Sequence, residues 1–217
     1  IKDMSSLQKV VLAAGALAVF GTGMWLYGYY GRLREQVYQA RKVEVAEYIQ
    51  RRAAQMIRPT DFAPSDGSHR GEAFETFFDA IQTPELFRIK VFSREPKIIW
   101  SNLKEIVGQD ASANLDVQTA LENGKVTLKF KSSKPEQISE RQFRKFTETY
   151  VPIRSATGAI VGVIEVYQTA FRIEENIKKQ FHKAAAIVLV VVLIGCCSVA
   201  LAFYAGAGSY PRQNSRI

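Results

Sequence analysis

Histidine and cysteine, two residue types that often carry catalysis and metal binding, are few in this sequence. Its only histidines, His69 and His182, lie far apart, and neither has a cysteine, histidine or carboxylate at the spacing of a metal site. Cys196 and Cys197 sit inside an apolar run, where cysteine packs as a small hydrophobic residue. The sequence contains no G-x-S-x-G nucleophile elbow, Gly-rich phosphate loop or Cys/His pair. We therefore predict a protein that is not an enzyme and that holds no metal or cofactor.

Positive charge does not gather into a nucleic-acid-binding surface. The chain has 29 Lys and Arg against 21 Asp and Glu, a net charge of +8, but the two signs are interleaved. Glu174 and Glu175, for example, stand among Arg172, Lys178 and Lys179, as in ion pairs along a helix. This pattern disfavours nucleic acid as a partner. The basic residues beside the apolar runs are expected to meet lipid phosphates instead.

Two uncharged apolar runs, Val10–Tyr30 and Ala184–Ala207, dominate the hydropathy pattern. A helix of about 20 apolar residues crosses the hydrocarbon core of a bilayer. The first run ends in aromatic residues (Trp25, Tyr27, Tyr29 and Tyr30), which fit the headgroup belt of an uncleaved anchor. We therefore predict a two-pass membrane protein with the lipid bilayer as a partner. The segments 1–9 and 208–217 would be short tails on the same side of the membrane.

Small residues recur at every fourth position in both apolar runs. Such spacing lets two helices approach closely in lipid, which predicts pairing of the spans with each other, with a second copy or with another membrane protein. The alternative is chance, because both runs are rich in alanine and glycine. The residues concerned are Ala14, Ala18 and Thr22 in the first run, and Ser198, Ala202 and Gly206 in the second.

The intervening region, 31–183, is long enough for one domain and alternates between helical and strand-like patterns. Helices are expected at 31–58, ended by Pro59, at 71–82, at 112–122, ended by Asn123-Gly124, and at 170–183, continuing into the second span. Strands are expected at 86–93, 97–101, 125–131, 143–154 and 159–169, with loops at 60–70 and 132–142. These elements predict an α+β fold: an antiparallel sheet of about five strands with helices packed on it.

Two hairpins carry a family resemblance. The first reads LFRIKVFSREPKIIWSN, followed by EIVGQD, and the second reads TYVPIRSATGAIVGVIEVY. Together with the long helix that leaves the first apolar run, they resemble the PAS-like (Cache) sensor domains of two-span bacterial receptors. The resemblance covers most of residues 31–183. It implies a bacterial inner-membrane protein whose 31–183 domain lies outside the cytoplasm, in the periplasm, with both termini inside. The basic residues beside the spans favour the opposite side, but that rule loses force for large domains.

The resemblance also implies a small organic ligand, a carboxylate or an amine, held in a pocket over the sheet. By analogy, the ligand would contact the side chains on or near the sheet that could line such a pocket: Trp100, Tyr150, Arg154, Glu165 and Tyr167. The alternative is a core of aromatic residues, with Arg154 beside a solvated hairpin turn. Family members also pair along the helix that corresponds to 31–58, which makes a homodimer a further expectation.

Two functions remain open from the sequence. Receptors of this kind transmit to a cytoplasmic kinase, cyclase or chemotaxis module, whereas only 208–217 follow the second span in the sequence as given. Either the natural chain is longer, or signalling goes through another protein. The first hypothesis is therefore a non-catalytic sensor that acts through partner proteins. The second is an accessory subunit that docks onto a larger membrane complex and senses no ligand, because fold alone does not determine function.

Overall fold

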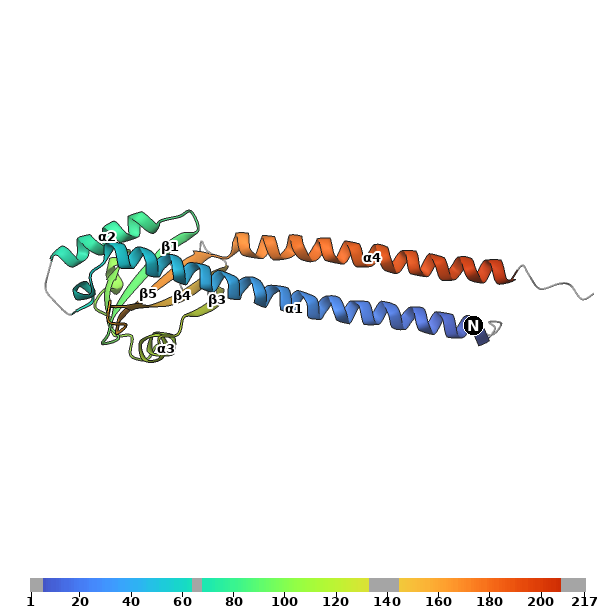
Figure 1. The fold of residues 1–217 in the computed structure, drawn as a ribbon, viewed down its shortest axis with the longest axis horizontal. Coiled ribbons are helices and arrows are strands. Elements are labelled where there is room, and N and C mark those ends of the chain that lie inside the picture. The colour runs from blue at the N-terminus through green and yellow to red at the C-terminus, as the bar shows by residue number, and fades with distance from the viewer. Residues whose placement is uncertain (1–5, 64–67, 133–144, 208–217) are drawn as a thin grey trace, which may run out of the picture. The chain divides into compact units, whose positions relative to one another are not determined.

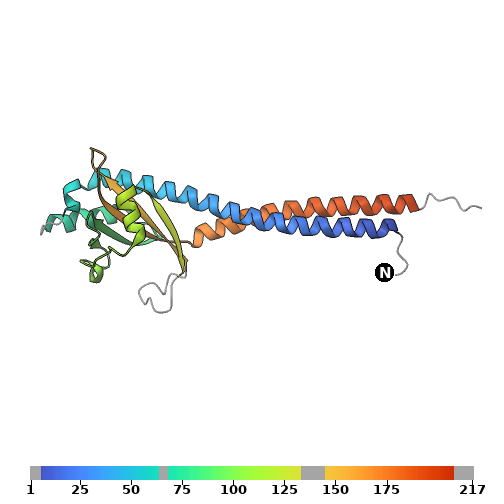
Figure 2. The ribbon, with the colours of Figure 1, turned by 90° about the horizontal axis from the view of Figure 1, so that it is seen from below.

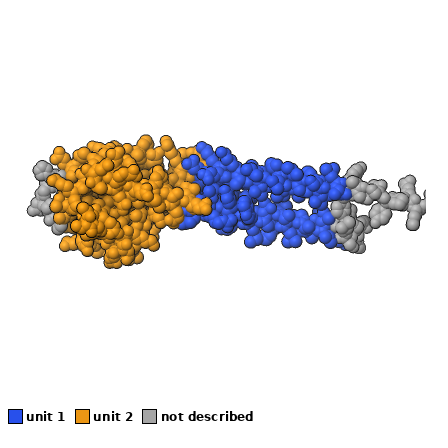
Figure 3. Space-filling model, viewed as in Figure 1, with its two compact units in different colours: residues 1–35, 176–217 blue, residues 36–175 orange. Residues whose placement is uncertain are grey.

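The computed structural model of this chain describes residues 6–63, 68–132 and 145–207. They form two compact units. Residues 1–35 and 176–217 make up the first unit, and residues 36–175 make up the second (Figure 3). The sheet and the candidate site belong to the second unit.

The two apolar runs lie within two long helices, α1 (Ser6–Met56) and α4 (Phe171–Ala207) (Figure 1). Both helices are long and apolar enough to cross a membrane, and none of the most apolar window of either is buried within the chain. A helix that spans a membrane presents a long, uniformly apolar surface of this kind to lipid. Near one end of the first unit, the rings of Tyr30 and Phe181 meet edge to face at 5.2 Å between centroids.

Most of the small residues predicted to pack against other helices are exposed within this chain. Ala14, Ala18, Ser198 and Ala202 are exposed, Thr22 is half-buried, and the backbone of Gly206 lies in α4. The hydroxyl of Ser198 donates to the carbonyl oxygen of Ile194, 2.8 Å away, so it meets its hydrogen-bonding need within its own helix. Pairing of these helix faces with another chain stays a prediction.

The sheet has five antiparallel strands in the spatial order β2-β1-β5-β4-β3. Figure 2 gives a second view of the sheet. Their bounds are Leu86–Ser93 (β1), Ile98–Ser101 (β2), Thr127–Ser132 (β3), Lys145–Arg154 (β4) and Ile160–Thr169 (β5). The predicted α+β fold is confirmed, and the limits of β1 are those that its period-two pattern predicts. The predicted loop 132–142 and the first residues of the predicted strand 143–154 lie almost entirely outside the described residues.

One face of the sheet is covered by α1 and by α2 (Ser68–Ile81) (Figure 1). Apolar residues three and four apart on each helix form the stripe that meets the sheet. From α1 and its end these are Val45, Ala46, Ile49, Ala53 and Ile57, and from α2 they are Phe74, Phe77 and Ile81. They pack against inward-facing strand residues that include Ile89, Val91, Val151, Ile164 and Val166. This is the larger of the two apolar clusters that the described residues form.

The first residues of the predicted loop 60–70 form a regular turn instead. Pro59–Phe62 forms a 3₁₀ turn, η1, in which the backbone N–H of Arg58 donates to Asp61 Oδ2 at 2.8 Å. Phe62 is only 2% exposed and its ring meets that of Phe74 edge to face. The ring also lies over Gly162, where a Cβ atom would overlap with Phe62 and with the carbonyl oxygen of Phe92. Glycine is therefore required at this position of β5.

The opposite face of the sheet carries α3 (Leu115–Asn123). The side chain of Asn114 caps its first turn, accepting from the N–H groups of Asp116 and Val117 at 3.0 and 3.3 Å. Gly124, in the left-handed conformation with φ of 60°, ends it. The helix stop predicted at Asn123-Gly124 is thus confirmed. A shorter 3₁₀ turn, η2 (Lys104–Ile106), lies between β2 and α3.

Candidate functional site

A group of charged and phenolic side chains lies on the α3 face of the sheet, over its central strands. It consists of Lys90 from β1, Glu148 and Tyr150 from β4, and Glu165 and Tyr167 from β5, and is called the sheet-face cluster below. Strand pairing places Glu165 directly between Lys90 and Tyr150, and places Glu148 beside Tyr167. Directly paired residues on neighbouring strands share a face, with Cβ atoms about 5 Å apart. The register therefore assembles the cluster.

Glu165 is the most deeply buried member, with no exposed surface. Its Oε2 lies 3.4 Å from Lys90 Nζ, an ion pair that compensates its charge. Neither carboxylate oxygen accepts a hydrogen bond of standard geometry in the described part of the chain, although the hydroxyls of Tyr150 and Tyr167 lie close enough to interact with the carboxyl group. A buried carboxylate normally fills these acceptor positions, because leaving them empty is costly. Glu165 thus keeps acceptor capacity for a ligand or for water.

Lys90 is shared between an acid and a phenol. Besides its ion pair with Glu165, its ammonium group donates to the hydroxyl of Tyr167 and lies 4.6 Å from the centre of that ring. The Arg88 guanidinium lies over the same ring, 5.7 Å from its centre. Burial, followed by the charge of Glu165, raises the pKa of Tyr167 and of Tyr150. Both phenols are therefore neutral hydrogen-bonding groups at physiological pH.

Glu148 is the member of the cluster whose pKa lies near neutral pH. Burial raises its pKa to about 7, the negative charge of Glu165 adds to the rise, and Lys131 and Lys90 oppose it. Lys131 Nζ is 3.9 Å from Glu148 Oε2, and the hydroxyl of Tyr150 donates to the same oxygen at 3.3 Å. Burial and the nearby charge of Glu165 leave Glu148 partly protonated near neutral pH.

The helix α3 is tied to the cluster at its first turn. The side-chain amide of its cap residue, Asn114, donates to the hydroxyl of Tyr150 at 3.5 Å. In the same turn Asp116 Oδ1 lies 3.3 Å from Lys129 Nζ on β3. A ligand that changed the position of Tyr150 would therefore also act on the capped end of α3.

Three of the five sequence-predicted ligand residues meet in this cluster, namely Tyr150, Glu165 and Tyr167. Trp100 lies on the other face of the sheet, paired with Val91, and its ring packs against Phe74 and Phe78. Arg154 is exposed at the end of β4, where it donates to the carbonyl oxygen of Gly158 at 2.9 Å. Both positions match the alternative of a core aromatic residue and a hairpin-turn arginine. A role of any of the five in ligand binding stays a prediction.

Sequence reasoning missed Lys90 and Glu148. The signal for Lys90 was present, because the alternation in β1 separates it from Ile89 and Val91. The pairing of β1 with β5, which are distant in the chain, was needed to bring Lys90 against Glu165. The alternation in β4 likewise predicts that Glu148 and Tyr150 share one face of the sheet. It does not predict that Glu148 lies opposite Tyr167, which depends on the pairing of β4 with β5.

The cluster offers groups that can hydrogen-bond a polar ligand. Its two carboxyl groups and two phenol oxygens are acceptors for ammonium or hydroxyl donors, and its lysine is a donor. Among the described residues, no group of three or more His, Cys, Asp or Glu side chains is placed to hold a metal ion.

No family model matches this chain, and neither does any curated protein. Solved structures that are similar to it include sensor domains. An extracellular ligand-binding receptor from Desulfohalobium retbaense is 16% identical with a TM-score of 0.42, over 66% of this chain and 26% of the receptor. The E. coli DcuS sensor domain is 17% identical with a TM-score of 0.40, over 68% of this chain and 98% of that domain. A sensory box sensor histidine kinase from Vibrio cholerae is 15% identical with a TM-score of 0.31, over 44% of this chain and 87% of that one. The chain thus spans about a quarter of the length of the first receptor, and the similarity concerns the fold.

Proposed function

We propose that this chain is a non-catalytic, two-pass membrane protein whose sheet-bearing domain binds a small ligand and signals through partner proteins. The observation that carries the proposal is the carboxylate of Glu165, which is fully buried, ion-paired with Lys90, and without a hydrogen bond of standard geometry to either oxygen among the described residues. A purely structural cluster gains nothing from empty acceptor positions in its centre. A binding site gains from them, because a ligand fills them on entry.

The ligand favoured by the cluster is a small organic amine. Of the two ligand classes expected from the sequence, a carboxylate would need a free cation, and Arg154 lies away from the cluster at the hairpin turn. Lys90 already faces Glu165 and Tyr167. A protonated amine would instead donate to Glu165 and, when it is ionised, to Glu148.

Thermal stability of the full chain in mild detergent tests this proposal. Ethanolamine and propylamine should raise the melting temperature at millimolar concentration, whereas acetate and succinate should not. The substitution Glu165→Gln should abolish the amine effect, because the amide keeps the size but loses the charge. The matched control Arg154→Gln, outside the cluster, should keep it. Stabilisation by neither amine, or an unchanged response of Glu165→Gln, would refute the proposal.

The side of the membrane is part of the same proposal: the domain would lie outside the cytoplasm, as in the receptor family that the hairpins resemble. A chain with Cys196 and Cys197 replaced by serine and a new cysteine at exposed Thr157 would report it. A membrane-impermeant maleimide should label this cysteine in intact spheroplasts. Labelling only after lysis would place the domain in the cytoplasm.

The second candidate function is an accessory subunit that docks onto a larger membrane complex. The exposed small-residue faces of α1 and α4 favour it, because such faces permit close packing against other helices in lipid. Extraction from the native membrane in mild detergent, followed by mass spectrometry, separates the two functions. A large partner at fixed ratio, together with no ligand response, would support the accessory subunit. Recovery alone, as a dimer or with a kinase-type chain would support the sensor.

A further inference from the structure

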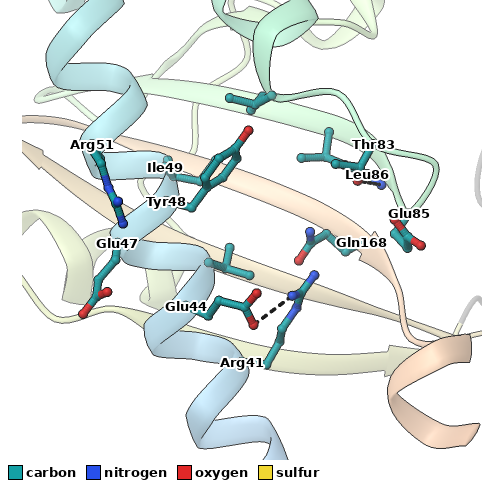
Figure 4. Close-up of a pocket in the computed structure, with 12 residues that line it drawn as sticks. Arg41, Glu44, Glu47, Tyr48, Ile49, Arg51, Thr83, Glu85, Leu86 and Gln168 are labelled. Carbon is teal, nitrogen blue, oxygen red and sulfur yellow. Dashed lines mark hydrogen bonds and ion pairs between the residues drawn. The ribbon is translucent and has the colours of Figure 1, made fainter. Parts of the chain in front are cut away.

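A cavity of about 460 Å³ lies on the face of the sheet opposite the sheet-face cluster (Figure 4). Its walls come from α1, from the end of α2 with the segment that leads into β1, and from Gln168 near the end of β5. This volume falls in the range of small-molecule sites, about 300–1,000 Å³. None of its lining residues belongs to the cluster on which the proposed function rests.

The floor of the cavity is apolar. Val45 and Ile49 of α1 line it together with Ile81 and Leu86, and all four side chains are buried. A short aliphatic group would therefore find a matching surface there, since burying apolar area against apolar area is favourable.

Two buried polar atoms in the wall have no partner in the described part of the chain. The first is Oε1 of Gln168, a residue that is only 7% exposed. The second is Nε of Arg41. Figure 4 shows both side chains at the cavity, with Gln168 reaching toward Arg41. One is an acceptor and the other is a donor, so the wall presents a complementary pair of unfilled hydrogen-bonding positions.

Two ion pairs already hold charged side chains of this wall. Arg41 Nη1 lies 2.9 Å from Glu44 Oε2, and Glu85 Oε1 lies 3.0 Å from Arg172 Nε. An anion would meet Glu44 and Glu85, and a cation would meet Arg41. A neutral occupant therefore fits better than a charged one, because it requires neither ion pair to open.

We propose that this cavity binds a neutral primary carboxamide or lactam with a short branched aliphatic body. The carbonyl oxygen of the ligand accepts from Arg41 Nε, its N–H donates to Gln168 Oε1, and its aliphatic part rests on the apolar floor. An amide is the smallest neutral group that carries an acceptor and a donor side by side in this way. The occupant would contact α1 and a residue of β5 close to the start of α4.

Calorimetric titration of the full chain in mild detergent with 4-methylpentanamide tests the proposal. We expect saturable binding, with 4-methylpentanoate and its methyl ester at least about tenfold weaker because each lacks the N–H donor. The substitution Gln168→Met should weaken amide binding about tenfold or more. Without ligand, the same variant should melt at the same temperature or higher, because it removes a buried amide oxygen that has no partner.

A matched control is available on α1. Gln50 donates its amide to the carbonyl oxygen of Pro152 at 3.1 Å, so its hydrogen bond is already made. Gln50→Met should lower the melting temperature and leave amide binding unchanged. Glu165→Gln should also leave amide binding unchanged, which separates this inference from the proposed function. No binding of the amide, equal binding of the ester, or a lowered melting temperature of Gln168→Met would overturn the proposal and indicate that ordered water alone bridges Gln168 and Arg41.

Discussion

The titration of Glu148 gives the most quantitative prediction from the structure. Its pKa is raised from 4.5 to about 7 in the folded protein, chiefly by burial, and its side chain is only 13% exposed. At about 1.4 kcal/mol per pKa unit, ionising Glu148 opposes folding by about 3 kcal/mol. Between pH 4.5 and 7 the folded state holds a proton that the unfolded state has lost. The contribution of Glu148 to the free energy of unfolding is therefore present at low pH and is lost as pH rises to about 7.

The substitution Glu148→Gln removes this dependence. The difference in unfolding free energy between the variant and the original chain should rise by about 3 kcal/mol, in favour of the variant, from pH 4.5 to 7.5. Urea unfolding of the full chain in detergent, followed by the fluorescence of Trp100 in a Trp25→Phe background, measures it. In a Glu165→Gln background the rise should be smaller, because the charge of Glu165 is the second cause of the shift. A difference that stays flat or falls with pH would refute the reasoning.

Two further substitutions probe the fold around the sheet by the same urea assay. Gly162→Ala should destabilise the domain by about 3 kcal/mol, because the added methyl group overlaps with the Phe62 ring and the Phe92 carbonyl oxygen; a loss below 0.5 kcal/mol would mean that Phe62 moves freely. Asn114→Ala should cost about 1 kcal/mol, because it removes the cap of α3. Circular dichroism should show little loss of helix, since α3 is short.

The elements of this protein were readable from local sequence. The alternation over 86–93 predicted a strand with the limits of β1, and Asn123-Gly124 predicted the end of α3. The two apolar runs predicted the helical segments that are long and apolar enough to cross a membrane. These predictions succeed because periodicity, caps and hydropathy act over a few neighbouring residues. The turn at Pro59–Phe62 was missed because its stability comes from Phe62, which packs against the distant Phe74.

The composition of the candidate site, in contrast, was decided by tertiary structure. The sequence determined that Lys90 and Glu165 alternate with apolar neighbours and that Glu148 stands between two threonines, and it determined the membrane-type helices on either side. Whether Trp100 shares a face with Glu165 depends on the register of β2 on β1 and of β1 on β5. A shift of one residue in either pairing would exchange the two faces, so no local pattern contains this information. The packing of α1 and α2 against one face and α3 against the other selects the register, because only one register buries the apolar side chains of every strand at once.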